Sequence, residues 1–435
     1  MPQISPFHGL RFNPAQVGDI GAALSPPYDV ISPTEQQQLL DQSPFNIVRV
    51  ELSRDEPDDS ESTNRYTRAA DLLRAWRASG ALIEEPSPSY YLLAHTFEWD
   101  GAPYTRRGLF AAVRLHPWSD GQILPHEETF SGPKEDRLKL LNATQVNVSP
   151  VFMVLRQQPS VLSTAWSAAE RSEPAMDIRT RNERQQLWVV NDAETLHAMA
   201  EQLDRQVLYI ADGHHRYETA LRYRDELMAV DPLGPAHPAQ FVLSHIATMD
   251  DPGLLVLPTH RLVKGVHPER VRTELSSYGA AFTSESINLE NPESAFDVAQ
   301  KRLEELGRDR PAFGLLASDS NVITLYVLND LEVLKLAAPR SVPAWRSLDV
   351  SALQTLVLDR ILPTHHERDA SITYARDPQV ALDAVRSGIC QVAFLMNTPS
   401  VRTMADVADA RARMPEKSTY FYPKVTTGLV MRSIA

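Results

Sequence analysis

The stretch VLYIADGHHRYETALRYRDEL, residues 207–227, has the clearest strand-to-helix pattern in this chain. Its apolar start, 207–210, is typical of a buried strand, and from Tyr217 onward the apolar positions follow helical spacing. The five residues D-G-H-H-R, 212–216, lie between the two patterns and predict a tight turn from strand to helix.

This predicted turn has the chemistry of an anion site. The first N–H groups of a helix lack partners within the helix and lie at the positive end of its dipole. Gly213, His214, His215 and Arg216 would therefore bind phosphate oxygens there. Asp212 would repel a phosphate, so it is better suited to bind Mg²⁺ or to accept a proton from a substrate. The alternative is structural: Asp212 caps the helix, Arg216 pairs with an acid, and the histidines are surface residues.

Glycine is scarce, which limits the kinds of phosphate site available. The 435 residues include 17 glycines and 32 prolines, and no two glycines lie closer than Gly18 and Gly21. A G-x-G-x-x-G fingerprint and a P-loop are therefore both excluded. Any phosphate site must rely on side chains and on a helix N-terminus.

The composition is that of a globular chain with 43% hydrophobic and 23% charged residues, enough for two or three domains. A net charge of −13 disfavours a general nucleic-acid-binding protein. The single cysteine, Cys390, excludes an intramolecular disulfide and fits a reducing compartment. The N-terminus does not resemble a signal peptide, and the apolar stretches are too short to span a bilayer. We therefore expect a soluble cytoplasmic protein without nucleic-acid or membrane partners.

Helical and strand patterns alternate along the chain, which predicts a mixed α/β or α+β fold. Residues 64–79 have the apolar spacing of a helix. Residues 90–99 and 106–115 are typical strands, and Asp100-Gly101 between them predicts a hairpin connection.

We expect two domains, with an approximate boundary that gives an N-terminal α/β region over 1–250 and a C-terminal α/β region over 251–435. The D-D-P-G sequence at 250–253 is the local mark of this boundary. A second clear helix is predicted over 349–362, with Asp349 as its candidate cap.

A second candidate segment, 124–152, carries many charges. Glu127 follows His126 and would serve as a general base or metal ligand. An S-G-P turn and a short amphipathic helix come next, and Lys134 and Arg137 on that helix would neutralise developing charge. No second histidine follows at zincin spacing. A solvated charge run before a helix explains the segment equally well.

A third segment, 414–429, surrounds three aromatic residues with cations and hydroxyls. Lys417, Ser418, Thr419 and Lys424 would bind a nucleotide or its phosphates beside the stacking rings. A C-terminal strand whose aromatic residues fill the core is the alternative.

Two further features are weaker. The prolines of S-P-P-Y-D-V-I-S, 25–32, hold Asp29 rigidly, and we interpret the segment as a structural turn, although a site is compatible with it. His260-Arg261 and the histidine pair at 365–366 do not suffice to predict a site.

Taken together, these motifs resemble the bacterial and archaeal family catalogued as domain of unknown function 1015. The resemblance rests on PPYDVIS, PHEETFSGPKEDRLKLLNAT, IADGHHRYETAL, LPTHRL and MPEKSTYFYPK, which follow one another in this order. It covers almost the whole chain and implies no particular activity.

The D-G-H-H-R turn is also similar to the signature turn of the ParB/sulfiredoxin-like fold, which opens a helix and holds nucleotide phosphates. Sulfiredoxins carry a catalytic cysteine where this chain has His214, and the acidic net charge argues against the DNA binding of ParB proteins. The free serine kinases use a D-G-H-H-R turn and are the nearest match by motif.

We therefore expect phosphoryl transfer to a metabolite hydroxyl from ATP, ADP or pyrophosphate with Mg²⁺. Asp212 or Glu127 would accept the hydroxyl proton, and Asp212 would bind the metal. L-serine as acceptor is implied by the distant resemblance alone. A nucleotide-binding switch without turnover and a metal-dependent phosphoester hydrolase are the alternatives.

Overall fold

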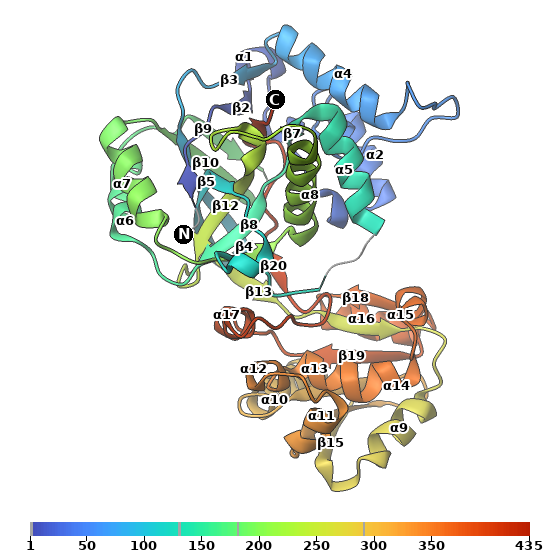
Figure 1. Cartoon of the computed structure of the whole chain (residues 1–435). Coiled ribbons are helices and arrows are strands. Elements are labelled where there is room, and N and C mark those ends of the chain that lie inside the picture. Colours follow the sequence, from blue (N-terminus) through green and yellow to red (C-terminus); the bar gives the residue numbers. More distant parts are fainter. Residues whose placement is uncertain (1–2, 129–131, 181, 290–291) are drawn as a thin grey trace. The chain divides into compact units, whose positions relative to one another are not determined.

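The chain divides into two compact units, each with its own sheet and core (Figure 1). The structure, a computed structural model, describes residues 3–128, 132–180, 182–289 and 292–435. Unit 1 comprises 1–125, 129–255 and 423–435, and unit 2 comprises 126–128 and 256–422. Both units combine helices with sheets, so the fold is mixed α/β, as predicted.

The division differs from a single boundary at residue 250. It falls after Leu255, residues 126–128 belong to unit 2, and the last thirteen residues, 423–435, return to unit 1. The reason is long-range pairing: Glu127 forms a parallel β-bridge with Met414, and the C-terminal strand pairs with two strands of unit 1. Local composition carries no signal for such pairings.

Unit 1 is built around a large sheet. In the part of the chain that is described, its strands follow the order β6-β11-β8-β12-β5-β4-β10-β9, with β1 added beside β5. The bounds are β1 (Ile4–Ser5), β4 (Tyr90–Trp99), β5 (Ala102–Arg114), β6 (Ile123–Leu124), β8 (Val151–Leu155), β9 (Met176–Arg179), β10 (Glu183–Val190), β11 (Leu208–Asp212) and β12 (Phe241–Thr248). The predicted β4–β5 hairpin is confirmed, and Asp100 and Gly101 both have positive φ, as its tight turn requires.

A smaller sheet of unit 1 joins the two ends of the chain. Its order is β3-β2-β21-β7, with bounds β2 (Gly9–Phe12), β3 (Leu82–Glu84), β7 (Val146–Asn147) and β21 (Met431–Ser433). The helices of unit 1 are α1 (Pro14–Val17), α2 (Pro33–Gln42), α3 (Val48–Glu51), α4 (Arg65–Ala78), α5 (Gly132–Thr144), α6 (Ser160–Ala169), α7 (Ala193–Leu203) and α8 (His214–Val230). The helix predicted over 64–79 is α4, capped by Asn64.

The main core of unit 1 lies between one face of the large sheet and its helices. Leu109, Met153 and Ile210 from the strands pack with Trp166 of α6 and Met199 of α7. Figure 1 shows α4, α5 and α8 running beside one another in the same unit. This packing fixes α8 at the end of β11.

Unit 2 contains a second sheet, whose strands pair antiparallel throughout the described residues. Its order is β15-β17-β16-β19-β14-β18, with bounds β14 (His260–Val263), β15 (Phe282–Asn288), β16 (Ala312–Ala317), β17 (Val322–Leu328), β18 (Ile372–Ala375) and β19 (Val392–Met396). Two short strands, β13 (Leu255–Leu257) and β20 (Tyr420–Tyr422), form a separate pair. The core joins Leu325 and Leu395 of the sheet to Leu303 and Val385 of two helices.

The helices of unit 2 are α9 (Pro268–Ser277), α10 (Pro292–Leu306), α11 (Leu331–Ala337), α12 (Pro343–Arg346), α13 (Asp349–Leu353), α14 (Asp359–Ile361), α15 (His365–Ser371), α16 (Pro378–Arg386) and α17 (Val401–Asp409). The predicted helix over 349–362 is interrupted by a π-helical turn, 354–358, between α13 and α14. The prediction of Asp349 as its cap is wrong. Leu348 occupies the cap position, and the Asp349 carboxylate bonds elsewhere. Along the described ranges, no helix is long and apolar enough to cross a membrane.

Candidate functional site

The strand, turn and helix predicted around the D-G-H-H-R motif are present in unit 1. Strand β11 ends at Asp212, Gly213 takes a left-handed conformation with φ 87°, and α8 begins at His214. A Cβ on Gly213 would lie 2.8 Å from the Arg216 Nε. Glycine is required here because any side chain would both strain the backbone and displace Arg216.

Asp212 lies at an irregularity of the sheet. The register between β11 and β8 shifts after Ile210, so that Asp212 pairs with Phe152. Its carboxylate accepts a hydrogen bond from Arg216 Nη2 at 2.6 Å and forms an ion pair with Lys424. The Asp212 side chain is 17% exposed, so it lies close to the surface without being open to it.

The electrostatics of this cluster are set by the two cations. Burial alone would raise the pKa of Asp212, but the ammonium of Lys424 and the guanidinium of Arg216 outweigh it and lower the pKa well below its usual range. The imidazole of His214 acts in the same direction. Asp212 is therefore ionised at neutral pH, and its two paired cations leave the cluster with an excess positive charge.

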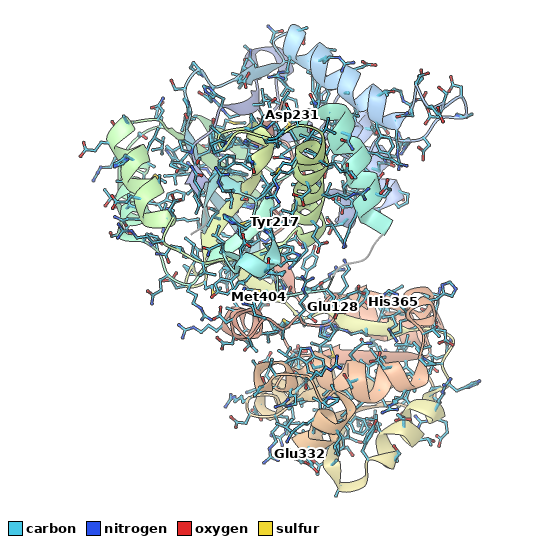
Figure 2. All side chains as sticks on the ribbon, in the orientation of Figure 1. Glu128, Tyr217, Asp231, Glu332, His365 and Met404 are labelled. Carbon is cyan, nitrogen blue, oxygen red and sulfur yellow. The ribbon has the colours of Figure 1, made fainter. Side chains whose placement is uncertain are left out.

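The first turn of α8 is held rigidly. Arg216 also donates to the carbonyl of Pro150, and the Tyr217 hydroxyl exchanges hydrogen bonds of 2.9 Å with the backbone of His116. The Tyr217 ring stacks on Trp118 with centroids 4.7 Å apart. Tyr217 and Asp231, both labelled in Figure 2, mark the first turn and the C-cap of this helix.

The N-terminus of α8 fits an anion. Gly213 has no side chain to cap the helix, and the structure shows no side-chain cap bond there. A long helix with this kind of start offers backbone N–H groups and the positive end of its dipole to an incoming ligand. The geometry thus combines a helix N-terminus with Arg216, Lys424 and the imidazole of His214.

Helix α5 brings a further ionic cluster to α8. Lys134 pairs with Glu218 of α8 at 2.7 Å. The guanidinium of Arg137 binds Asp136 at 2.5 Å, donates to the Glu51 carbonyl at 2.7 Å and lies 4.2 Å from the Tyr28 ring centroid. Arg137 is thus buried among fixed partners rather than displayed to a ligand. Ser131 of the predicted S-G-P turn lies outside the described residues.

Glu51 links the two clusters. Burial raises the pKa of the Glu51 carboxyl, while both Arg137 and Arg216 act to lower it. Tyr28 is also influenced by both arginines, although burial dominates and raises its pKa. The predicted structural turn at 25–32 therefore borders the Arg216 environment.

The other predicted site residues lie in unit 2, where Glu127 organises residues 414–419. Glu127 Oε1 accepts the Lys417 backbone N–H at 2.8 Å, and the buried His126 bonds Thr419 Oγ1 through Nε2 at 2.9 Å. Lys417 has φ 55°, and the buried Ser418 donates to the Pro415 carbonyl. These contacts hold a turn in shape.

The structure thus brings together Asp212, Arg216 and Lys424 in unit 1, and groups Glu127 with Lys417, Ser418 and Thr419 in unit 2. Glu51 is not among the site residues predicted from the sequence. It lies in the stretch N-I-V-R-V-E-L, 46–52, where its carboxylate alternates with apolar residues and no local pattern marks it as part of a site.

Mg²⁺ commonly binds one or two carboxylates together with the phosphates of a substrate. Asp212 supplies one such carboxylate. Within the described ranges, the one group of three side chains near enough to share an ion is Glu56, Asp58 and Asp59, in an acidic loop. The residues at Asp212 therefore fit an Mg²⁺ that arrives with nucleotide phosphates, not one held by protein ligands alone.

The family whose description is "Protein of unknown function (DUF1015)" matches residues 4–351 of this chain. The comparison of this chain with curated proteins found no significant match.

Several solved structures are similar. A free serine kinase mutant in complex with AMP has 14% identity and a TM-score of 0.38, over 72% of this chain and 87% of that one. A conserved hypothetical protein from Pyrococcus furiosus has 14% identity and a TM-score of 0.36, over 73% and 92%. SbnI with a C-terminal truncation, from Staphylococcus aureus, has 12% identity and a TM-score of 0.35, over 72% and 85%. TM-scores at this level do not determine the function of this chain.

Proposed function

The chain belongs to the family described as "Protein of unknown function (DUF1015)", a description that names no activity, and we propose that it is a small-molecule kinase. It would transfer a phosphoryl group from ATP, ADP or pyrophosphate to the hydroxyl of a metabolite. The observation that carries the proposal is the Asp212 carboxylate between Arg216 and Lys424 at the uncapped start of α8.

The phosphates of the donor would bind at the α8 N-terminus. Lys424 and Arg216 are cations with several N–H donors each, the kind of group that binds phosphate oxygens through charge-assisted hydrogen bonds. His214 and His215 begin the same helix and would contact the same phosphates. Phosphoryl transfer depends mostly on positioning and on neutralising charge, which is what these cations supply.

Asp212 would hold Mg²⁺ and orient the acceptor. Its lowered pKa makes it a weak proton acceptor and a persistent anion. In the transfer, the acceptor oxygen forms a bond to the terminal phosphorus, the bond from that phosphorus to the bridging oxygen breaks, and the hydroxyl proton leaves to water. Glu127 is the alternative proton acceptor, but its hydrogen bond from the Lys417 backbone N–H favours a role in positioning residues 414–419.

L-serine is the acceptor we propose to test first, supported by the resemblance of the D-G-H-H-R turn to free serine kinases. The experiment incubates the purified protein with Mg²⁺, L-serine and each of ATP, ADP and pyrophosphate, and detects phosphoserine by mass spectrometry. Nucleotide binding without product favours a switch protein, and phosphate release that does not depend on L-serine favours a hydrolase.

Variants test the site separately from the acceptor. Arg216→Ala and Lys424→Met should each weaken nucleotide binding by tenfold or more. Arg205→Ala is the matched control, because Arg205 forms an exposed i,i+4-type pair with Glu201 at 2.7 Å elsewhere in unit 1. Wild-type nucleotide affinity and turnover in both site variants would show that the site is misassigned, whatever the reaction.

A further inference from the structure

Unit 2 contains a cavity of about 420 Å³ that plays no part in the proposed kinase site. Pockets of roughly 300–1,000 Å³ accommodate metabolite-sized ligands. Its wall includes Arg261 of β14, Asp349 of α13, Asn397 after β19 and Thr403 of α17. Met404, the buried neighbour of Thr403, is labelled on α17 in Figure 2.

Asp349 is a carboxyl group in this wall that lacks a cationic partner. Its Oδ1 accepts the Ala312 backbone N–H at 2.9 Å, and its Oδ2 accepts from Asn397 Nδ2 at 2.9 Å. Among the described residues, no lysine, arginine or histidine forms an ion pair with it. Burial raises the pKa of Asp349 to about 7, because neither amide partner carries a charge.

Asn397 has an acceptor atom without a hydrogen-bond partner. Its Nδ2 donates to Asp349 Oδ2 and, at 3.2 Å, to the Leu303 carbonyl. The two acceptors fix the orientation of the amide, since a flipped side chain would place its oxygen against both of them. Asn397 Oδ1 is therefore an acceptor, and this buried atom has no hydrogen-bond partner in the described structure.

Gly307 allows the Asn397 amide to occupy this position. A Cβ on Gly307 would lie 2.2 Å from Asn397 Nδ2, so any larger residue would displace the amide from Asp349. Burying an unpartnered acceptor beside an unpaired carboxylate costs free energy that a donor with positive charge would recover.

We propose that this cavity binds a small molecule through a primary ammonium group that pairs with the Asp349 carboxylate, beside the Asn397 amide. An ammonium group offers three N–H donors and one positive charge, which match a carboxylate that has no cationic partner. Ser400 and Thr403 also line the cavity. Arg261 in the wall also donates to the carbonyls of Thr259 and Lys417, and its positive charge would favour an amino acid over a simple diamine, because a guanidinium complements a carboxylate.

Isothermal titration calorimetry at pH 8 tests the proposal with amines and matched molecules that lack the amino group. The probes are L-serine against glycerate, L-lysine against 6-hydroxyhexanoate, and putrescine against 1,4-butanediol. We expect at least one amine to bind at 1:1 stoichiometry while its counterpart does not. Preference for the amino acids identifies the ligand class, and preference for putrescine identifies a diamine site. Failure of every amine at millimolar concentration would overturn the proposal.

Asp349→Asn should reduce the affinity of the bound amine at least tenfold. Arg272→Ala is the control, because Arg272 pairs with Asp319 on the exposed surface of the same unit. Glu304 also lines the cavity, so Glu304→Gln distinguishes the two carboxylates. Loss of binding in Glu304→Gln with retention in Asp349→Asn would refute the assignment to Asp349.

A measurement on the unmodified protein avoids any folding defect of a variant. Since the ammonium binds the ionised form of Asp349, binding at pH 6.5 should release a fraction of a proton, and binding at pH 8 close to none. Titrations in two buffers of different ionisation enthalpy measure this release. Equal proton release at both pH values would contradict the involvement of Asp349.

Discussion

Lys424 and Asp212 form an ion pair although 212 residues separate them in the chain. Lys424 reaches this position because residues 423–435 return to unit 1, where Arg106 Nη1 donates to the Pro423 carbonyl at 2.6 Å. Arg106 is fully buried, so this bond fixes the backbone one residue before Lys424. The C-terminal segment thus supplies a cation to the turn that ends β11.

Removing the Asp212 charge should leave the binding of nucleotide phosphates intact and abolish its enhancement by Mg²⁺. In Asp212→Asn, Arg216 and Lys424 lose their anionic partner, so ADP should bind without Mg²⁺ at least as tightly as to the wild type. The enhancement of binding by Mg²⁺ and the turnover should both be lost. Calorimetric titrations of ADP with and without Mg²⁺ measure this, and a Mg²⁺ enhancement that survives in Asp212→Asn would contradict the role of Asp212.

Substitution of Gly213 should lower the free energy of unfolding by more than the positive φ of this residue alone would cause. Gly213→Ala places a methyl group 2.8 Å from Arg216 Nε at φ 87°, whereas Gly80→Ala has φ 74° and no heavy atom within 4 Å of the new Cβ. We expect about 1 kcal/mol of destabilisation for Gly80→Ala and distinctly more for Gly213→Ala. Urea denaturation of both variants measures the difference. Equal losses would show that contact with Arg216 is unimportant.

The buried pair of Arg137 and Glu51 should be strongly coupled. Arg137→Met leaves the Glu51 carboxylate buried beside fewer positive charges, so we expect about 3–5 kcal/mol of destabilisation near neutral pH. Because the pKa of Glu51 is raised in the folded state, protonation of Glu51 stabilises the fold at low pH, and this stabilisation is lost as the pH rises through that pKa. The destabilisation caused by Arg137→Met should therefore be smaller in acid. In urea denaturation, the double variant Arg137→Met with Glu51→Gln should lose less free energy of unfolding than the two single variants lose together.

Asp349 should impose a pH dependence on the ligand-free protein. Its pKa rises from 3.8 to about 7 on folding, so between these values the folded state holds a proton that the unfolded state has released. The free energy of unfolding therefore falls as pH rises through this window, by about 1.4 kcal/mol per unit. Glu304, Arg261 and Arg308 line the same cavity and are unchanged in Asp349→Asn.

Relative to the wild type, Asp349→Asn should become more stable by about 2–3 kcal/mol as the pH is raised from 5 to 8. Urea denaturation at both values measures the change. A constant difference between the two proteins would show that Asp349 titrates normally.

Local sequence patterns predicted several of the helices and strands of this protein. The apolar run before Asp212, the glycine and the helical spacing after it predicted β11, the turn and α8, because each depends on residues adjacent in the chain. The hairpin at Asp100-Gly101 and the helix α4 were predicted for the same reason. The scarcity of glycine likewise excluded glycine-rich phosphate loops from the sequence alone.

Tertiary structure decided which charged groups meet. Sheet order and the return of the C-terminus brought Lys424 to Asp212, and helix packing placed Arg137 against Glu51. Asp349, which has the local pattern of a helix cap, instead bonds Ala312 and Asn397. The preference of a residue for a helix or a cap amounts to a few tenths to about one kcal/mol. Hydrogen bonds to partners that long-range strand pairing brings near contribute as much or more, so they override this local preference. The sequence alone determined where the turn and its charges lie along the chain, and only the fold determined which of those charges share a site.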